Sequence, residues 1–137
     1  MLTDAIRQLI LDEQARQSGQ FIEGVDLDAY LRKLDEQAEI HADERDGRCR
    51  GFVAYYCNNE QTRQAFITSV VVAPPDRGTG LGRALVSAVL DTCRQRGFTT
   101  CRLEVRSDNT TAIAMYSTLG FTAVAERDHR QVLEIAL

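Results

Sequence analysis

The chain has 137 residues, of which 44% are hydrophobic and 26% charged, and its formal net charge is −4. This composition is typical of a globular protein and argues against a disordered or fibrous chain, and the length predicts a single domain over residues 1–137. The longest apolar stretch, residues 67–73, is far shorter than the roughly 20 residues of a membrane-spanning helix, so no membrane partner is expected.

The charge is unevenly distributed along the chain. Residues 1–64 contain 13 acidic and 8 basic side chains, whereas residues 65–137 contain 7 and 8. An acidic chain binds nucleic acid poorly, so no nucleic-acid partner is expected. A small polyanionic ligand, if the protein binds one, is expected in residues 65–137. The amino terminus lacks the basic flank and apolar block of a secretory signal, which predicts a cytoplasmic protein.

Apolar periodicity and turn residues predict ten elements in the order α-α-β-β-β-α-β-α-β-β. Nine of the elements are expected at residues 3–17, 27–38, 39–44, 50–57, 65–72, 81–96, 100–106, 121–126 and 131–137. The remaining one, the last helix, begins after a cap at Asp108 or Asn109 and ends at Leu119. The pair Asp46-Gly47 is a hairpin signal, and the β-branched, uncharged run 65–72 suits a central strand buried on both faces. The order defines a mixed α/β (α+β) sheet with helices on its faces.

The helix at 81–96 is predicted to bury one stripe. Its members would be Leu81, Ala84, Leu85, Ala88, Val89 and Thr92.

The cysteines and histidines do not form a metal-binding pattern. Cys49, Cys57, Cys93 and Cys101 contain no CxxC pair, and His41 and His129 lie far apart in the sequence. Reduced, packed thiols are therefore favoured over a zinc site or a redox dithiol, and no metal is expected.

The most informative segment is VVVAPPDRGTGLGRAL, residues 70–85. It leads from a buried strand through three alternate glycines into an amphipathic helix. Such a turn exposes backbone N–H groups beside a helix N-terminus, an arrangement that favours a pyrophosphate, and Arg77 and Arg83 flank it. The alternative is that the glycines only make a tight turn and that both arginines are solvated.

The glycine spacing decides in part which phosphate ligand the turn would bind. The pattern G-x-G-x-G is neither a dinucleotide fingerprint nor a P-loop. It resembles the acyl-CoA-binding signature of the GNAT superfamily of N-acetyltransferases, Arg/Gln-x-x-Gly-x-Gly/Ala, through Arg77, Gly80 and Gly82. A second segment, LEVRSDNTTAIAMYSTLGF at 103–121, resembles the superfamily's other signature, most closely that of the bacterial enzymes that acetylate the N-terminal alanine of a ribosomal protein.

The resemblance implies a fold and a cosubstrate site. In this family the sheet is mostly antiparallel, and a central parallel pair of strands splays apart to hold acetyl-CoA. The pantetheine arm would bond to the backbone of one strand and to Asn109, which also suits a helix N-cap. The implied cosubstrate-binding residues are Val70, Val71, Val72, Arg77, Gly78, Thr79, Gly80, Leu81, Gly82, Arg83 and Asn109.

The resemblance also implies two catalytic residues. Deprotonating an alkylammonium at pH 7 costs about 4.6 kcal/mol without assistance. Glu104 matches the family's general base, although Arg102 and Arg106 alternate onto its face and offer an ion pair instead. Tyr116 matches the acid that protonates the departing thiolate, and its alternative is a packed aromatic. A backbone N–H near Val71 or Val72 would stabilise the oxyanion.

The sequence departs from the family pattern in two places. Only Met1-Leu2 precede the first helix, so the usual first strand is short or missing, and a partner chain in a homodimer is one way to complete the acceptor side. The strand segment Ala65–Ser69 offers no carboxylate, although some members use one there. The base is therefore Glu104 or a residue of the first half such as Glu23, Glu39, His41 or Asp43.

The leading interpretation is an N-acetyltransferase that moves the acetyl group of acetyl-CoA to a primary amine by direct transfer in a ternary complex. The acceptor stays open among a peptide N-terminus, a polyamine, an aminoglycoside and an amino sugar. By analogy, the loop Ser18–Asp28 and the pair Tyr55-Tyr56 would line the acceptor side. The alternative interpretation is a non-catalytic acyl-CoA-binding regulatory module.

Overall fold

The computed structural model describes residues 2–17, 21–22 and 26–137. Its elements are α1 (Asp4–Arg16), α2 (Leu27–Gln37), β1 (Glu39–Arg45), β2 (Arg48–Tyr56), β3 (Gln64–Val72), a 3-10 turn η1 (Pro74–Asp76), α3 (Leu81–Gln95), β4 (Thr100–Arg106), α4 (Thr110–Leu119), β5 (Thr122–Arg127) and β6 (Arg130–Ala136). The predicted order is confirmed, and each predicted boundary lies within about two residues of the observed one.

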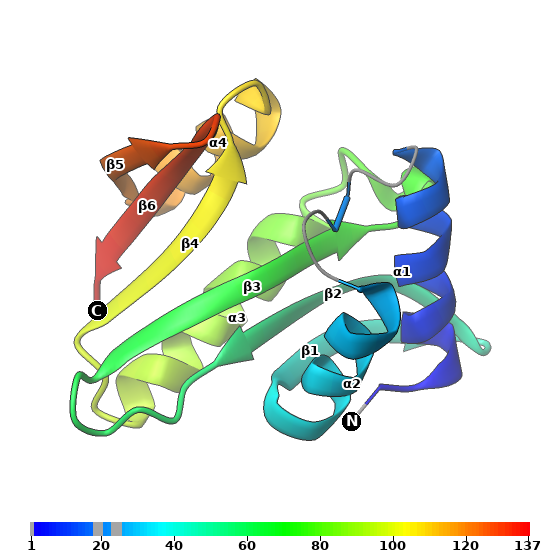
Figure 1. The fold of residues 1–137 in the computed structure, drawn as a ribbon, viewed down its shortest axis with the longest axis horizontal. Coiled ribbons are helices and arrows are strands. Elements are labelled where there is room, and N and C mark those ends of the chain that lie inside the picture. Colours follow the sequence, from blue (N-terminus) through cyan, green and yellow to red (C-terminus); the bar gives the residue numbers. More distant parts are fainter. Residues whose placement is uncertain (1, 18–20, 23–25) are drawn as a thin grey trace.

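The six strands form one sheet in the order β1-β2-β3-β4-β6-β5. Every neighbouring pair is antiparallel except β3 and β4, which are parallel. Figure 1 shows these two strands side by side at one end and parting toward the other. The fold is therefore the mixed, mostly antiparallel sheet with a central parallel pair that the sequence predicts.

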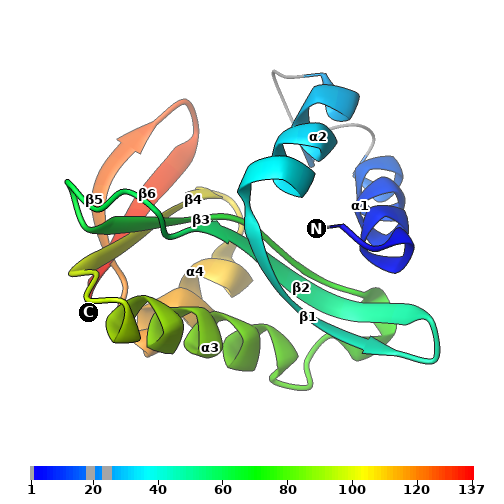
Figure 2. The ribbon, with the colours of Figure 1, turned by 90° about the horizontal axis from the view of Figure 1, so that it is seen from below.

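Helices cover both faces of the sheet. Figure 2 shows α1 and α2 on one face, over the β1–β2 half, and α3 and α4 on the other. Phe52, Ala54 and Val71 belong to the core cluster under α1 and α2, whereas Val53 and Leu103 belong to the larger cluster under α3 and α4. The face of β4 and β6 opposite α3 and α4 carries polar side chains, and this open half borders the site described below.

The hairpin and capping signals are confirmed. Asp46 and Gly47 both have positive φ, 53° and 75°, in the turn between β1 and β2. The side chain of Asp26 caps α2 by accepting from the backbone N–H of Ala29. In the part of the chain that the structure describes, no strand precedes α1, and no helix is long and apolar enough to cross a membrane.

The predicted buried stripe of α3 is partly wrong. Ala84 and Ala88 are exposed, and the helix instead buries Leu85, Val86, Val89, Leu90 and Cys93. This stripe carries more apolar surface than one with two alanines and a threonine, so turning it toward the sheet gains more free energy. Gly51 of β2 permits the close approach, because a Cβ there would lie 3.2 Å from Leu81 Cδ2 and 3.3 Å from Leu85 Cδ1.

The separation of β3 from β4 creates the space for a ligand. The two strands are paired only from Gln64 with Thr100 to Ile67 with Leu103. Beyond that point β3 continues beside β2, and β4 continues beside β6. A β-bulge accompanies the parting, because Tyr55 pairs with Ile67 while Ala54 pairs with Ser69, leaving Thr68 as the extra residue.

Candidate active site

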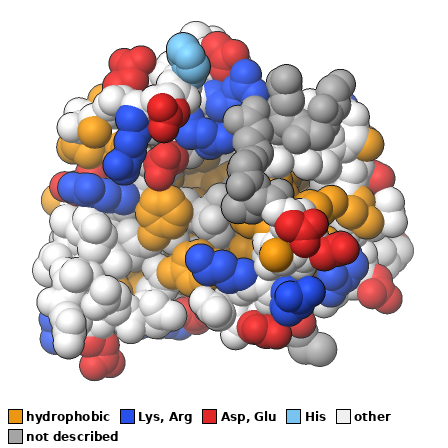
Figure 3. All heavy atoms as spheres, viewed as in Figure 1, with side chains coloured by type: hydrophobic (Ala, Val, Ile, Leu, Met, Phe, Trp, Pro, Cys, Tyr) orange, Lys and Arg blue, Asp and Glu red, His pale blue; other side chains and the backbone are white. Residues whose placement is uncertain are grey.

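A cavity of about 650 Å³ lies where β3 and β4 part. Its walls are the β3 segment 68–72, the loop 76–83 with the start of α3, the end of β4, and α4, and Glu13, Phe21 and Tyr30 line it from the α1–α2 side. The cavity is thus bordered by helices from both faces of the sheet. In Figure 3, basic and acidic side chains gather beside the hollow in the upper part of this face.

The β3 wall offers unpaired backbone. From Thr68 to Val72 this strand has β2 on one side and the cavity on the other, so its polar groups directed toward β4 have no strand partner there. Val70, Val71 and Val72 all line the cavity, as predicted for a strand that bonds an extended ligand. The side chain of Ser69 adds a polar atom, because its Oγ is buried without a hydrogen-bond partner in the described part of the chain.

The glycine-rich loop forms the second wall. Gly80 is the N-cap of α3 with φ 86°, a left-handed conformation that favours glycine, and the N-terminus of the helix is presented to the cavity. Gly78, Leu81, Gly82 and Arg83 also line the cavity. Thr79 is placed differently, because its hydroxyl donates to the carbonyl of Asp76 at 2.6 Å and the residue is outside the cavity lining.

Asp76 anchors this loop to the β2 strand. Its carboxylate accepts from Arg48 at 2.9 Å and from Arg50 at 2.8 Å, and the side chain is buried. These hydrogen bonds from Arg50 and Arg48 hold the pKa of Asp76 below its usual range. The bonds fix the start of the glycine turn against the sheet before any ligand binds.

The two flanking arginines are exposed, and each is also bonded to a protein group. Arg77 donates from Nε to the carbonyl of Val72 at 3.0 Å and from Nη2 to the carboxylate of Glu13 at 2.9 Å. Arg83 donates to the hydroxyl of Thr118 on α4. Both arginines line the cavity and keep further N–H groups for an anion.

Asn109 lies at the junction of the cavity and α4. Its side-chain oxygen accepts from the backbone N–H of Ala112 at 3.2 Å, so the predicted helix-capping role is confirmed. The cap uses the oxygen and leaves the side-chain NH₂ as a donor. The same residue lines the cavity, and the two roles are therefore compatible.

Tyr116 reaches the cavity from α4. Its ring is buried and packs edge to face on Phe121, with the ring centres 5.6 Å apart. Burial raises the pKa of the phenol to about 12. The hydroxyl therefore stays protonated at neutral pH and is placed on the α3–α4 side of the cavity.

Glu104 lines the cavity from the opposite face of the sheet. The side chain is exposed, whereas its neighbours Leu103 and Val105 point into the core under α3 and α4. The two arginines of its face have other contacts. Arg102 is bonded to Glu134, and Arg106 contacts Asp108 at 3.3 Å.

The other base candidates lie elsewhere. Glu39 is paired with Arg96, His41 with the hydroxyl of Tyr55 at 2.9 Å, and Asp43 with Arg50 at 3.1 Å, and none of the three lines the cavity. Glu23 lies outside the described residues. The prediction that Tyr55 lines the acceptor side is wrong, because its ring is 1% exposed within the core.

The other acceptor-side predictions fare differently. Tyr56 packs with the α1–α2 cluster and is outside the cavity lining. Of the loop 18–28, the described residues Phe21 and Ile22 line the cavity, and residues 18–20 and 23–25 lie outside the described part.

The sequence analysis assigns no site role to several polar residues of the cavity, among them Glu13, Ser69 and Arg130. Glu13 carries a signal, because it stands on the apolar stripe of the first helix with Ile6, Leu9 and Ile10 and is 5% exposed. Ser69 and Arg130 carry none, since a serine in a strand and an arginine in a hairpin are ordinary. Among the described residues, no three metal-ligating side chains gather.

The splayed sheet, the glycine turn and the α4 wall together give the chain a GNAT-type fold. Residues 4–121 match the model of the acetyltransferase (GNAT) family, and the chain belongs to this family.

Two curated relatives illustrate the similarity. An L-2,4-diaminobutyric acid acetyltransferase of Nocardia farcinica is 38% identical over 89 residues, 65% of this chain and 44% of that protein. The ribosomal protein bS18 alanine N-acetyltransferase of Escherichia coli is 41% identical over 64 residues, 47% of this chain and 43% of the relative. The chain thus matches about half the length of its curated relatives.

Solved structures share the fold over nearly the whole chain. The crystal structure of the ribosomal-protein-S18-alanine N-acetyltransferase from Escherichia coli has a TM-score of 0.74 at 24% identity and covers 99% of this chain and 89% of that one. The PaiA N-acetyltransferase from Thermoplasma acidophilum, solved with coenzyme A, has a TM-score of 0.68 at 14% identity and covers 100% and 81%.

Proposed function

We propose that this chain is an acetyl-CoA-dependent N-acetyltransferase that transfers the acetyl group directly to a primary amine within a ternary complex. The observation that carries the proposal is the parting of β3 from β4 beside a glycine turn at the N-terminus of α3. Family membership supports the acyl-transfer chemistry. The names of the two curated relatives, which specify a diamino acid and a protein alanine, support an amine acceptor and leave its identity open.

The residues present fit acetyl-CoA. The β3 segment 68–72 offers an unpaired strand edge that suits the two amides of a pantetheine arm. The loop at Gly78 and Gly80, with Arg77 and Arg83, suits the pyrophosphate. A methyl group added at Gly80 would meet no protein atom within 4 Å, so the space above this backbone is open to a ligand.

Two groups of the chain would move protons. An acceptor ammonium on the α1–α2 side would give its proton to Glu104, directly or through water, and the free amine would attack the thioester carbonyl. A backbone N–H of β3 near Val71 or Val72 would bind the carbonyl oxygen as negative charge develops on it. The thiolate that leaves would take the proton of Tyr116, whose raised pKa keeps the phenol protonated until that moment.

The non-catalytic module is the second hypothesis, and it makes a different prediction for Tyr116. A binding module would need the cavity without the proton donor. The placement of a buried phenol and an exposed carboxylate on the same cavity favours the enzyme.

The cytoplasm is the proposed location, and the four buried free thiols support it, because such thiols are typical of a reducing compartment. That residues 1–137 form a single domain, and that the protein forms a homodimer, are still predictions.

Thermal unfolding with acetyl-CoA tests the function without an acceptor, with CoA, NADH and ATP as comparators. A ligand at 100 times its dissociation constant adds about 2.7 kcal/mol, or about 5 to 10 °C for a domain of this size. We expect such a shift with acetyl-CoA and CoA and none with NADH. If the protein is folded and acetyl-CoA does not change its melting temperature, the proposal is contradicted. If the melting temperature rises, thiol release during an amine screen distinguishes an enzyme from a non-catalytic module.

A further inference from the structure

The hydroxyl of Ser69 is a polar group of the cavity wall that is buried without a partner. The residue is 7% exposed, and its Oγ finds no hydrogen-bond partner among the described residues. Burying a hydroxyl in this way destabilises a fold, and an alanine at the same place would avoid the cost. Because Ser69 also lines the cavity, a ligand bound there can supply the missing partner.

This hydroxyl lies on the α1–α2 face of the sheet. Its register partner on β2, Ala54, and the second residue further along β3, Val71, both belong to the core cluster under α1 and α2. The helix that follows the glycine turn, α3, packs on the other face, as Figure 2 shows. A group that contacts the hydroxyl is therefore on the side of the cavity lined by Phe21 and Tyr30, away from α3.

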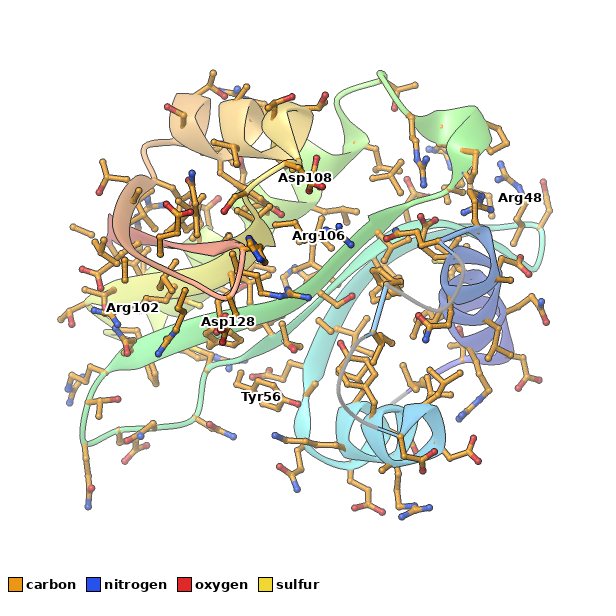
Figure 4. The ribbon with its side chains drawn as sticks, turned by 45° about the horizontal axis from the view of Figure 1, so that its top comes forward. Arg48, Tyr56, Arg102, Arg106, Asp108 and Asp128 are labelled. Carbon is orange, nitrogen blue, oxygen red and sulfur yellow. The ribbon has the colours of Figure 1, made fainter. Side chains whose placement is uncertain are left out.

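Ser69 and Glu104 lie on the two sides of the gap between β3 and β4. The parallel pairing ends at Ile67 with Leu103, so Glu104 is the first residue of β4 beyond it and Ser69 is the second of β3. In Figure 4, Arg106, two residues further along β4, lies between this strand and β3. Since Glu104 and Ser69 line one cavity from the same face of the sheet, a small group between the strands can contact both.

The attacking nitrogen of an amine needs such a contact. When the new N–C bond forms, the nitrogen of a primary amine becomes positively charged and carries two N–H groups. One proton passes to the general base, and the other N–H needs an acceptor once water has been displaced. A serine oxygen offers two lone pairs. The hydrogen bond strengthens as the nitrogen gains charge, so it stabilises the transition state more than the bound substrate.

Resting on the proposed acetyltransferase function, we propose that Ser69 Oγ accepts an N–H of the acceptor amine and thereby selects primary over secondary amines. A secondary amine keeps one N–H after the N–C bond forms, and the base takes it, so the serine oxygen gains no partner. Ser69 itself is unchanged, since the acetyl group moves from sulfur to nitrogen and the proton goes to the base. The assignment holds for any carboxylate that acts as base, including Glu23 outside the described residues.

Matched primary and secondary amines test the proposal. The tripeptide Ala-Gly-Gly, putrescine and glucosamine are each compared with the derivative whose amino groups carry one methyl group, and thiol release gives kcat/KM. We expect the wild type to favour the primary member by at least tenfold, and Ser69→Ala to lower this ratio by about tenfold. Because both substrates are measured on one variant, the amount of active protein cancels. Acetyl-CoA affinity should stay within twofold.

Two further variants separate the hydrogen bond from other effects. Ser69→Cys leaves no extra space for a methyl group but offers only a weak acceptor, so the ratio should fall here as well. Ser107→Ala is the matched control, because this half-buried hydroxyl at the end of β4 contacts Glu126 at 3.5 Å and is outside the cavity lining. The control should keep the wild-type ratio. Ser69→Ala should not lower the melting temperature, because its hydroxyl has no partner to lose.

Three results overturn the proposal. The first is an equal ratio in wild type and Ser69→Ala, or a ratio that falls in Ser69→Ala but not in Ser69→Cys. The second is a loss of acetyl-CoA affinity in Ser69→Ala, which would place the hydroxyl in the cosubstrate site. The third is a lower melting temperature in Ser69→Ala, which would show that the hydroxyl supports the fold.

The remaining outcomes separate the two proposals. If acetyl-CoA shifts unfolding but no amine releases thiol, the shift that each primary amine adds in the presence of CoA is measured instead. An added shift that Ser69→Ala loses supports the amine contact, whereas no added shift, or one that Ser69→Ala keeps, overturns it while the acyl-CoA site stands. If acetyl-CoA produces no shift, the acetyltransferase function itself fails.

Discussion

Arg77 Nη2 donates to Glu13 Oε2 at 2.9 Å, a bond that joins the first helix to the loop that would hold the pyrophosphate. The two residues are 64 positions apart, and Glu13 is 5% exposed. The carboxylate also accepts from Arg16 and from Gln17. Because α1 borders the cavity on one side and the loop borders it on another, this contact links two walls of the cavity.

Arg77→Gln should weaken acetyl-CoA binding by about tenfold, because it removes a charged donor beside the pyrophosphate and releases the loop from α1. Isothermal titration of acetyl-CoA measures the change. Arg16→Gln is the control, since Arg16 bonds to the same carboxylate but is outside this cavity lining. Equal affinities in the two variants would show that the Arg77 side chain only supports α1.

The glycine turn allows a comparison at matched backbone strain. Gly80 and Gly47 have φ of 86° and 75°, and a Cβ at either meets no atom within 4 Å. Gly80→Ala and Gly47→Ala should therefore each lose about 1 to 2 kcal/mol of stability. Only Gly80→Ala should also lower acetyl-CoA affinity, by tenfold or more, because its methyl group occupies the space beside the loop. Denaturant unfolding and titration of both variants check this, and a normal affinity in Gly80→Ala would remove the pyrophosphate from this turn.

Much of the fold follows from local signals. The turn at Asp46 and Gly47, the cap at Asp26 and the alternation in β4 are each written in a few adjacent residues, and all three are observed. The orientation of α3 is not local. Whether Ala88 or Val86 faces the sheet depends on which stripe buries more surface against strands distant in sequence. The local pattern predicted that Ala84 and Ala88 are buried, whereas the helix buries Val86 instead.

The site divides in the same way. The glycine turn and the segment 103–121 are contiguous motifs, and most of the site residues that sequence analysis predicts in them line the cavity, with Thr79 as the exception. Glu13 and Arg130 reach the same cavity through long-range contacts, Glu13 by bonding Arg77 and Arg130 through its register with Arg106. Tyr55 was predicted to line the cavity and does not. Tyr55 and Tyr56 are adjacent in sequence, so their side chains point to opposite faces of the strand, and Tyr55 packs into the core under α3 and α4.

Tyr116→Phe should lower kcat by about 100-fold and leave acetyl-CoA affinity within twofold, because in the proposed mechanism the phenol would donate a proton only as the thiolate leaves. Steady-state kinetics and titration measure the two quantities. Tyr55→Phe is the control, since it loses a hydrogen bond to His41 at 2.9 Å and neither residue lines the cavity. It should cost about 1 kcal/mol of stability and leave kcat unchanged. An unchanged kcat in Tyr116→Phe, with normal cosubstrate binding, would favour the non-catalytic module.

The raised pKa of Tyr116 also predicts the alkaline behaviour. Its phenol ionises near pH 12 in the folded protein and near pH 10 in the unfolded chain. The unfolded state therefore loses this proton first, and the stability that the buried neutral phenol contributes below pH 10 is lost as the pH rises toward 12. Tyr116→Phe should lose less stability than wild type between pH 9 and 11 in thermal unfolding. If stability falls equally steeply with pH in both proteins, the phenol of Tyr116 is not shielded from water.

Glu104→Gln tests the base. If Glu104 takes the ammonium proton, the wild-type rate levels off at a lower pH, whereas the variant depends on the small fraction of free amine and keeps rising with pH toward about 10. We expect kcat/KM at pH 7 to fall by about 100-fold. Glu134→Gln is the matched control, because Glu134 lies on the same face of the neighbouring strand, bonded to Arg102 and outside the cavity. It should keep the wild-type profile from pH 6 to 9. If Glu104→Gln keeps that profile as well, the proton is taken by a residue of the first half of the chain, where Glu13 is the described carboxylate on the cavity wall.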